Sequence, residues 1–421
     1  MKVFKFGGAS LKDAPSIKNV ASIIEAHSQS PLLVVVSAIG KTTNELEKVV
    51  EHFYRHQRET AAQLLNGVQD NCTRIARKLL PDDNHPLFHQ LQELYAEMAW
   101  QLGEKAYAPY DYYYDQLVSR GELISSMIVH AYLKERIATA HWLDVREVFR
   151  SDDTYRDGRI QWEISGQLMT EKVQPLFKTT PLVITQGFIA ATDQGKTTTL
   201  GREGSDYSAA LFANMLDAES LTIWKDVEGL KNADPRLFAD TLNISTINFN
   251  EVIEMAYYGA KVIHPKTIKP LQNKGIPLYV KCFLNATLPG TVINGTNGLQ
   301  KLPPLIVLKK QQALITVTTK DFSFISEENL SRLYTLFHEL QIKLNLMQTG
   351  AISCSFCIDQ RADKIERLIK ALHPYFKIDY DESLEILTIR YYEEDMINRL
   401  TAGKQILLEQ KSPKTLQLVM R

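Results

Sequence analysis

The sequence predicts an α/β domain with a mainly parallel central sheet, followed by a smaller α+β domain of the ferredoxin-like type. Residues 2–6 have a strand pattern ending at Gly7 and Gly8, and a helical pattern then leads to the continuous apolar run at 31–37. A strand, a glycine turn, a helix and a buried strand form a βαβ unit. After a linker-like segment at 296–304, the pattern changes to short strands with two helices. The length of 421 residues accommodates two domains.

The elements of the first domain, residues 1–295, follow from apolar spacing. A helix is expected at 16–26, and one-face spacing predicts a helical subdomain from about 44 to 135. Short apolar runs predict strands at 140–143, 181–185 and 187–189, and a hairpin around 193–196. Ser205 and Asp206 are expected to cap a helix at 207–216. A strand at 221–224, a helix at 250–258 and a strand at 277–283 complete the domain.

The C-terminal part, residues 305–421, predicts a different arrangement. Strands are expected at 313–319, 342–348, 351–359, 376–380 and 384–391, with helices at 328–340 and 362–375. This order is the βαββαβ pattern of ferredoxin-like domains. A small two-layer domain of this kind favours a binding or regulatory role over chemistry of its own.

Composition excludes several classes of partner. The 48 Lys and Arg residues nearly balance the 49 Asp and Glu residues, so a nucleic-acid or membrane-surface partner is not expected. No apolar stretch near Met1 is long enough for a signal peptide and no later run has transmembrane length, so neither element is expected. The four cysteines are too few and too scattered for a disulfide framework, which predicts a cytoplasmic protein. Cys354 and Cys357 lie three apart on an expected strand, so they would face opposite sides and not share a metal.

Common phosphate-binding and kinase motifs are missing. Two Gly-Lys-Thr tripeptides, at 40–42 and 195–197, lack the first glycine of a P-loop, because Val35 and Ala190 stand there. The sequence has no G-x-G-x-x-G after a strand, and the H-R-D and D-F-G elements of protein kinases are missing.

Two glycine turns carry the chemistry instead. Lys5 ends a strand before Gly7 and Gly8, where backbone N–H groups can approach a phosphate closely. Arg202 and Asp206 lie in a second glycine loop that opens onto a helix N-terminus, a favourable position for an anion. Arg202 can form a bidentate pair with a carboxylate.

Further charged residues follow other strand ends and helix starts. Their types are those that an amino acid and a polyphosphate need together, and a parallel sheet would collect them at one edge. Each of them singly is more often a solvated charge. They are Glu122, Lys225, Asp226, Lys231, Arg236 and Lys261.

At these positions the sequence resembles the aspartokinases of the amino acid kinase family. Six segments carry the resemblance, in family order and across the whole first domain. They are KFGGAS at 5–10, VVVSAIGKTTNEL at 34–46, SRGELIS at 119–125, TLGREGSDYSAAL at 199–211, IWKDVEGLKNADPR at 223–236 and EMAYYGAKVIHPKT at 254–267. The resemblance implies a three-layer sandwich and transfer of the ATP γ-phosphoryl group to the β-carboxylate of L-aspartate.

The resemblance also implies roles for particular residues. Lys5 and Asp206 would be the catalytic pair, with Lys5 on the transferring group and Asp206 orienting the lysines. Aspartate would be framed by Ser37, Thr43, Glu122, Arg202 and Ser205. The nucleotide site would be formed by Lys5, Gly7, Gly8, Ser10, Lys225, Asp226, Lys231, Arg236, Lys261 and Val262. Mg²⁺ would be held mainly through the ATP phosphates, and no protein metal site is expected.

Some positions depart from the family pattern. Glu203 replaces a usual glycine and Lys225 a frequent threonine, and we expect this opposite pair to form an ion pair across the site. The tail resembles paired ACT domains, with a strand at 305–309 that belongs to the second one and with that second one reduced. The resemblance implies a homodimer through these domains and room for an amino-acid effector. Where lysine-sensitive members carry an aspartate and then Ser-Glu, this chain has Asn345 and Gly350-Ala351. Weak or absent inhibition by lysine is therefore expected.

Two alternatives remain open from the sequence. One is another amino acid kinase, acting on glutamate, acetylglutamate or uridylate. The other is a catalytically silent amino-acid sensor on the same scaffold. Arg202 with Glu122 favours a free α-amino acid, and Lys5 with Asp206 favours an active enzyme.

Overall fold

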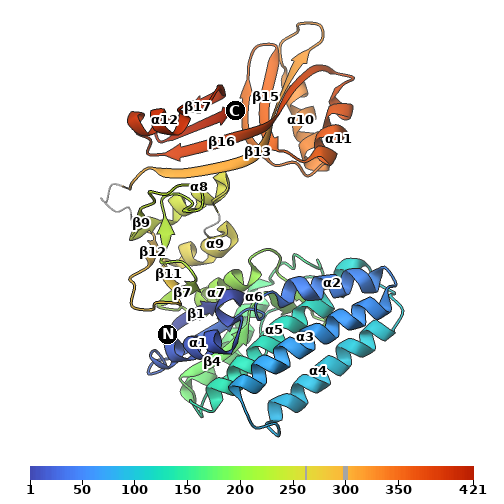
Figure 1. Ribbon diagram of the computed structural model, residues 1–421, viewed down its shortest axis with the longest axis vertical. Helices are drawn as coiled ribbons and strands as arrows, with labels where there is room; N and C mark the ends of the chain where they lie inside the picture. Colours follow the sequence, from blue (N-terminus) through green and yellow to red (C-terminus); the bar gives the residue numbers. More distant parts are fainter. Residues whose placement is uncertain (261–262, 297–301) are drawn as a thin grey trace. The chain divides into compact units, whose positions relative to one another are not determined.

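The computed structural model describes residues 1–260, 263–296 and 302–421 (Figure 1). The chain forms two compact units, which we describe separately. The first contains residues 1–230, 245–252 and 263–297, and the second contains 231–244, 253–262 and 298–421. The expected boundary near 295 thus separates most of the chain, but two short segments before it pack with the second unit. Most of the expected linker, 297–301, lies outside the described residues.

The first unit is built on an eight-stranded sheet in the order β10-β12-β11-β7-β1-β2-β4-β3. Its inner strands β1 (Lys2–Phe6), β2 (Leu32–Val36), β4 (Leu182–Gln186) and β7 (Ser220–Lys225) pair in parallel. β3 (His141–Leu143), β10 (Thr246–Asn248), β11 (Leu278–Cys282) and β12 (Thr291–Asn294) complete it, and only β11 and β12 pair antiparallel in the described sheet. This confirms the predicted α/β class with a mainly parallel sheet.

Helices cover this sheet, and one group of them forms the expected helical subdomain. α2 (Thr42–Tyr54), α3 (Arg58–Leu79), α4 (Pro86–Gly103) and α5 (Tyr110–Lys134) lie side by side (Figure 1). α1 (Ala14–Glu25), α7 (Gly204–Met215) and α9 (Pro265–Lys274) belong to the sheet region, and α8 (Phe249–Tyr258) spans the division between the units. β2 and β4 are buried along their whole length, as expected of strands covered on both faces.

One segment has more structure than the sequence analysis predicted. Residues 145–178 contain η2 (Val145–Glu147), α6 (Trp162–Leu168), η3 (Met169–Val173) and η4 (Gln174–Lys178). These pieces are short and irregular, so they carry little periodic signal. The predicted hairpin follows as β5 (Ile189–Ala191) and β6 (Thr197–Thr199).

The expected cap of α7 is wrong. The helix begins at Gly204, so Ser205 and Asp206 lie in its first turn and not before it. Glu203 takes the N-cap position with a left-handed φ of 53° and no side-chain capping bond. Because Asp206 does not cap its own helix, its carboxylate can serve another partner.

The second unit is built on a six-stranded antiparallel sheet in the order β14-β15-β13-β16-β18-β17. Its strands are β13 (Leu305–Thr319), β14 (Leu344–Thr349), β15 (Ser353–Asp359), β16 (Phe376–Arg390), β17 (Ile406–Lys411) and β18 (Thr415–Met420). Its helices are α10 (Glu327–Glu339), α11 (Ala362–Leu372) and α12 (Glu394–Thr401). β8 (Leu230–Lys231) and β9 (Asn243–Ile244) form a separate two-stranded ladder.

β13 and β16 are each one long strand where the sequence predicted two. They pair with each other from Leu305–Arg390 at one end to Thr319–Phe376 at the other. The register shifts between Lys309 and Leu314, and Gln311 has a left-handed φ of 55° in this irregularity. The polar residues at 309–312 interrupt the apolar pattern there, which explains why the sequence divides the strand.

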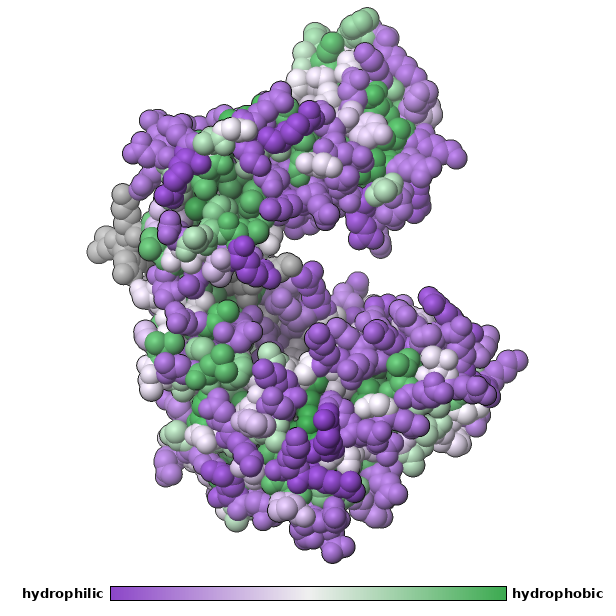
Figure 2. Space-filling view, in the orientation of Figure 1, coloured by the Kyte–Doolittle hydropathy of each residue, from purple (hydrophilic) through white to green (hydrophobic). Residues whose placement is uncertain are grey.

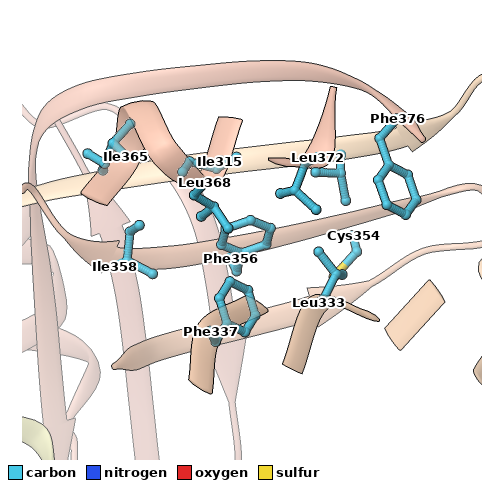
Figure 3. Packing of buried hydrophobic residues seen from close by; sticks show 12 residues of the cluster. Ile315, Leu333, Phe337, Cys354, Phe356, Ile358, Ile365, Leu368, Leu372 and Phe376 are labelled. Atoms are coloured by element: carbon cyan, nitrogen blue, oxygen red, sulfur yellow. The ribbon is translucent and has the colours of Figure 1, made fainter. Parts of the chain in front are cut away.

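The core of the second unit lies between its sheet and α10 and α11. Figure 3 shows Phe337 from α10 and Leu368 from α11 packed on either side of Phe356 from β15. Cys354 belongs to this cluster, whereas Cys357 packs in a second cluster with Leu314 and Val419. The two cysteines therefore serve opposite faces of β15, as predicted.

The visible face of the molecule is mostly hydrophilic, with smaller hydrophobic areas among the charged residues (Figure 2). No helix in the described ranges combines the length and the apolar character needed to cross a membrane.

Candidate active site

One cavity of about 660 Å³ in the first unit collects most of the predicted site residues. It lies where β1 and β7 end and where α5 and α7 meet the sheet. The carboxyl ends of parallel strands are the usual ligand-binding edge of such sheets. The predicted residues that line it are Lys5, Gly7, Gly8, Ser10, Ser37, Thr43, Glu122, Arg202, Ser205, Asp206, Lys225 and Asp226.

Four predicted nucleotide residues are not in this set. Lys231 and Arg236 belong to the second unit, where Lys231 ends β8 and Arg236 pairs with Asp234 at 2.7 Å. Lys261 and Val262 lie outside the described residues.

Lys5 and Asp206 form a buried ion pair in the lining of the cavity. Lys5 Nζ lies 2.6 Å from Asp206 Oδ1, and Lys225 Nζ lies 3.9 Å from Asp206 Oδ2. Burial raises the pKa of Asp206, but the charges of Lys5 and Lys225 outweigh it and hold the pKa below the usual value. Asp206 is therefore an ionised anchor for two cations, each on the end of a parallel strand.

The glycine turn after β1 is packed tightly against the loop after β2. A Cβ atom on Gly8 would lie 2.6 Å from the carbonyl oxygen of Gly40 and 2.9 Å from that of Ala38. Ser10 Oγ donates a 2.6 Å hydrogen bond to the Gly7 carbonyl and closes the turn. Only glycine allows this approach, and it leaves the backbone of the turn facing the cavity.

The second glycine loop supplies Arg202, which is exposed and lines the cavity just before α7. Glu203 beside it accepts a 3.1 Å hydrogen bond from the backbone N–H of His264. The predicted ion pair between Glu203 and Lys225 is not observed among the described contacts. Lys225 lies near the carboxylate of Asp206 instead, and the carboxylate of Glu203 accepts the bond from His264.

Glu122 reaches the cavity from the middle of α5. It is 3% exposed, and its Oε2 has no hydrogen-bond partner among the described residues. Burial raises its pKa to about 8, partly offset by the Ala38 backbone and the charge of Lys5. Ser125, one turn further along α5, donates a 2.6 Å bond to the Ser37 carbonyl and ties the helix to the strand end. A buried carboxylate with an unused oxygen is suited to receive a cation.

Several further residues that line the same cavity were not predicted from the sequence. Among them are Glu47, Tyr114, Arg156 and Thr199, which lie on the wall formed by α2, α5, the 152–158 loop and β6. Arg156 falls in the segment for which no structure was predicted, and Tyr114 ends the aromatic run at 110–114, a pattern that favours packing over ligand binding because no basic residues are interleaved with it. The neighbouring Asp115, an acidic residue among the apolar residues of α5, is the sequence signal that could have identified this wall.

The arrangement can bind a polyphosphate beside a small zwitterion. It offers cations at the glycine turns, an arginine for a carboxylate and a buried glutamate for an ammonium group. The described residues contain no group of three or more His, Cys, Asp or Glu side chains placed to hold a metal ion.

Comparisons with known proteins agree with this site. The amino acid kinase family model matches residues 1–282. Lysine-sensitive aspartokinase 3 of Escherichia coli (strain K12) is 30% identical over 416 residues, which cover 96% of this chain and 89% of that relative. Aspartokinase 1, chloroplastic, of Arabidopsis thaliana is 30% identical over 85% of this chain, which spans 63% of the plant protein.

Solved structures with the same fold include two of E. coli aspartokinase III. The complex with aspartate and ADP, in the R-state, has a TM-score of 0.81 and 28% identity, covering 100% of this chain and 96% of that one. The complex with lysine and aspartate, in the T-state, has a TM-score of 0.83 and 27% identity, covering 100% and 95%.

Proposed function

The chain belongs to the amino acid kinase family, and from this premise we propose that it is an aspartate kinase. It transfers the γ-phosphoryl group of ATP to the β-carboxylate of L-aspartate and releases ADP and 4-phospho-L-aspartate, the first step toward lysine, threonine and methionine. The observation that carries the proposal is the single cavity that holds Lys5 paired with Asp206 together with Arg202 and Glu122.

Each residue has a role that its surroundings support. Arg202, at the exposed loop before α7, binds the α-carboxylate of aspartate as a bidentate partner. The unpartnered Oε2 of Glu122 receives the α-ammonium group. Ser37, Thr43 and Ser205 complete the acceptor site.

The phosphoryl group passes directly between the two substrates. A β-carboxylate oxygen attacks the γ-phosphorus, the bond to the bridging oxygen of ADP breaks, and ADP leaves. The attacking carboxylate is already ionised at neutral pH, so no base is needed. Lys5 stabilises the charge on the transferring group, and Asp206 holds Lys5 and Lys225 in place.

We assign the nucleotide to the glycine turn and to the end of β7. Gly7, Gly8 and Ser10 present the turn after β1, and Lys225 and Asp226 follow β7. Lys231, Arg236, Lys261 and Val262 remain part of this proposal from the family resemblance alone. Mg²⁺ would accompany ATP, held mainly through the phosphates, where it neutralises charge.

The C-terminal residues 305–421 serve, in our proposal, as a regulatory pair of ACT domains, the second one reduced, that joins two copies of the chain. Residues 1–295 form the catalytic domain, with 296–304 as linker. The four cysteines are all free and buried, which supports a reducing, cytoplasmic location.

The test is a coupled ADP-release assay with ATP and, in turn, aspartate, glutamate and acetylglutamate. We expect ADP release with aspartate and none with glutamate or acetylglutamate. Turnover with another acceptor would move the chain to a different amino acid kinase. No turnover with any of them would favour the silent sensor, which Lys5, Arg202 and Asp206 in one cavity argue against.

A further inference from the structure

Arg156 is a second arginine in the wall of the cavity that holds Arg202. It lies on the loop before α6, and its guanidinium carbon is 4.3 Å from the ring centre of Tyr114. Its Nη2 lies 3.7 Å from Glu47, which is one turn beyond Thr43 on α2. Because Thr43 belongs to the proposed acceptor site, this contact puts Arg156 at the aspartate end of the cavity.

The backbone of Arg156 is held in a conformation that ordinary residues avoid. Its φ is 68°, in the left-handed region. Its N–H donates a 3.0 Å hydrogen bond to Asp115 Oδ2. Strained backbone of this kind persists only where the surroundings enforce it, and such places cluster at functional sites.

Asp115 fixes two parts of the cavity wall at once. It is fully buried in α5, and it also accepts bonds of 2.8 and 2.7 Å from the N–H and hydroxyl of Thr199. One buried carboxylate thus joins α5, the Arg156 loop and the end of β6. The exposed part of this structure is the guanidinium, which is the part that a ligand would meet.

The present partners of the guanidinium are replaceable. The ion pairs with Glu47 at 3.7 Å and Asp111 at 3.4 Å are long and partly exposed, so each contributes little. Stacking on Tyr114 fixes the plane of the guanidinium and leaves its N–H groups available at the edge. A substrate carboxylate would bind there more strongly, as a bidentate partner.

We propose that Arg156 is a substrate-binding residue that takes the second carboxylate of the acceptor and fits the site to a dicarboxylic amino acid. Arg202 binds the α-carboxylate, and Arg156 binds the β-carboxylate through one lone pair of each oxygen, which leaves the second lone pair of one oxygen free to attack the γ-phosphorus. This inference rests on the proposed function, and Asp115 acts in it as a positioning residue that holds the Arg156 loop against Thr199.

The experiment is steady-state kinetics of Arg156→Gln and Arg156→Lys in the full-length chain. For R156Q we expect KM for aspartate to rise roughly tenfold to one hundredfold, with KM for ATP within about twofold of the wild type. R156K keeps the charge but not the planar fork, so it should recover part of the loss. Competitive inhibition by L-asparagine, which lacks the second carboxylate, should be unchanged in R156Q.

Arg159→Gln is the matched control, because Arg159 is exposed on the same loop but does not line the cavity. It should leave both KM values unchanged. An R156Q enzyme with wild-type KM for aspartate would overturn the inference, as would an equal rise of both KM values, which indicates a structural role. A wild-type enzyme inactive with aspartate would instead reject the proposed function.

Discussion

Asp206 determines how charge is arranged in the active site, although its sequence position suggested a helix cap. Inside the first turn of α7 it is buried and contacts Lys5, at the end of β1, and Lys225, at the end of β7. Two cations from neighbouring strands are therefore fixed by one anion. Removing that anion would leave Lys5 buried without a counter-charge, which is costly.

We predict that Asp206→Asn lowers kcat by roughly a hundredfold or more, because Lys5 loses the partner that aims it at the transferring group. The variant should also be destabilised, by about 3–5 kcal/mol. Kinetics and thermal unfolding measure the two effects. The matched control is Asp217→Asn beyond the other end of α7, where Asp217 forms an exposed pair with Lys274 and should matter little. A D206N enzyme with wild-type kcat would contradict the assigned role.

The raised pKa of Glu122 should make aspartate binding depend on pH. Burial raises its pKa to about 8, so the carboxyl is mostly protonated at pH 7 in the substrate-free enzyme. The ammonium group of aspartate binds the ionised form, and binding therefore releases a proton. The ionised fraction of Glu122 rises from about 0.03 at pH 6.5 to about 0.76 at pH 8.5, so KM for aspartate should fall by roughly twentyfold to thirtyfold over this range. In Glu122→Gln it should be high and flat across this range.

The same shift affects stability. The pKa of Glu122 in the folded protein lies above the ordinary glutamate value of 4.5, so its contribution to the free energy of unfolding is complete below pH 4.5 and is lost as pH rises through about 8. Because aspartate compensates the buried charge, its stabilising effect on Tm should be larger at pH 8.5 than at pH 6. An equal Tm shift at both values would argue against Glu122 as the ammonium partner.

Individual site residues were predictable where a motif identified them, and their contacts were not. Lys5, Arg202 and Asp206 stand in recognisable glycine loops, whereas the Lys5–Asp206 pair depends on how α7 packs beside β1. Arg156 was missed because its position depends on a long-range bond to Asp115, 41 residues away in the sequence. Local pattern contains no trace of such a contact.

At the scale of elements, the turn between β1 and α1 is set by one glycine. Gly8→Ala would place a Cβ 2.6 Å from a backbone carbonyl oxygen, which no side-chain motion can relieve. We expect a destabilisation of about 1–3 kcal/mol and a raised KM for ATP, since the turn must move.

Gly67→Ala is the matched substitution for this prediction. Gly67 lies exposed inside α3, where an added Cβ would meet nothing within 4 Å. It should stabilise the protein by roughly 0.5–1 kcal/mol with normal kinetics. If both alanine variants behaved alike in thermal unfolding and in KM for ATP, the packing argument for Gly8 would fail.

Element prediction succeeded where periodicity was strong and failed where polar residues interrupted it. The continuous apolar run of β2 predicted a buried strand, and the one-face spacing of α2 predicted a helix, as observed. Polar residues inside β13 and β16 interrupt the apolar pattern, so the sequence predicted two short strands in place of each long one. In the structure each strand continues through these residues, because pairing with a neighbouring strand stabilises strand residues of low intrinsic propensity.

The second unit predicts weak or absent inhibition by lysine. Lys309 Nζ lies 2.9 Å from Asn345 Oδ1 and 2.7 Å from Asp359 Oδ1, so a cation of the chain itself already occupies these oxygens. Asn345 in turn donates to Gln312 and Asp359, at 2.6 and 2.9 Å. Initial rates with lysine up to millimolar concentrations should stay close to the uninhibited rate. Inhibition at micromolar lysine would refute this expectation.

At the scale of the whole molecule, the strand β14 lies at the edge of the six-stranded sheet and has one unpaired side among the described strands. Such an edge is a template for pairing with another chain. We predict a homodimer through the C-terminal sheet, with a mass in light scattering of twice the 47.9 kDa of one chain. A monomer at micromolar concentration would contradict this.

The pairing of β13 with β16 along their full length has a consequence for how the second unit comes apart. Each strand contributes to the cluster around Phe356 at one end and to the cluster around Leu387 at the other. If the part of the unit around Phe356 unfolds, the part around Leu387 also loses β13 and β16, and the reverse is equally true. We therefore expect amide hydrogen exchange around Phe356 and around Leu387 to report one shared opening reaction. A ligand or substitution that stabilises one of these two parts should then slow exchange in the other as well.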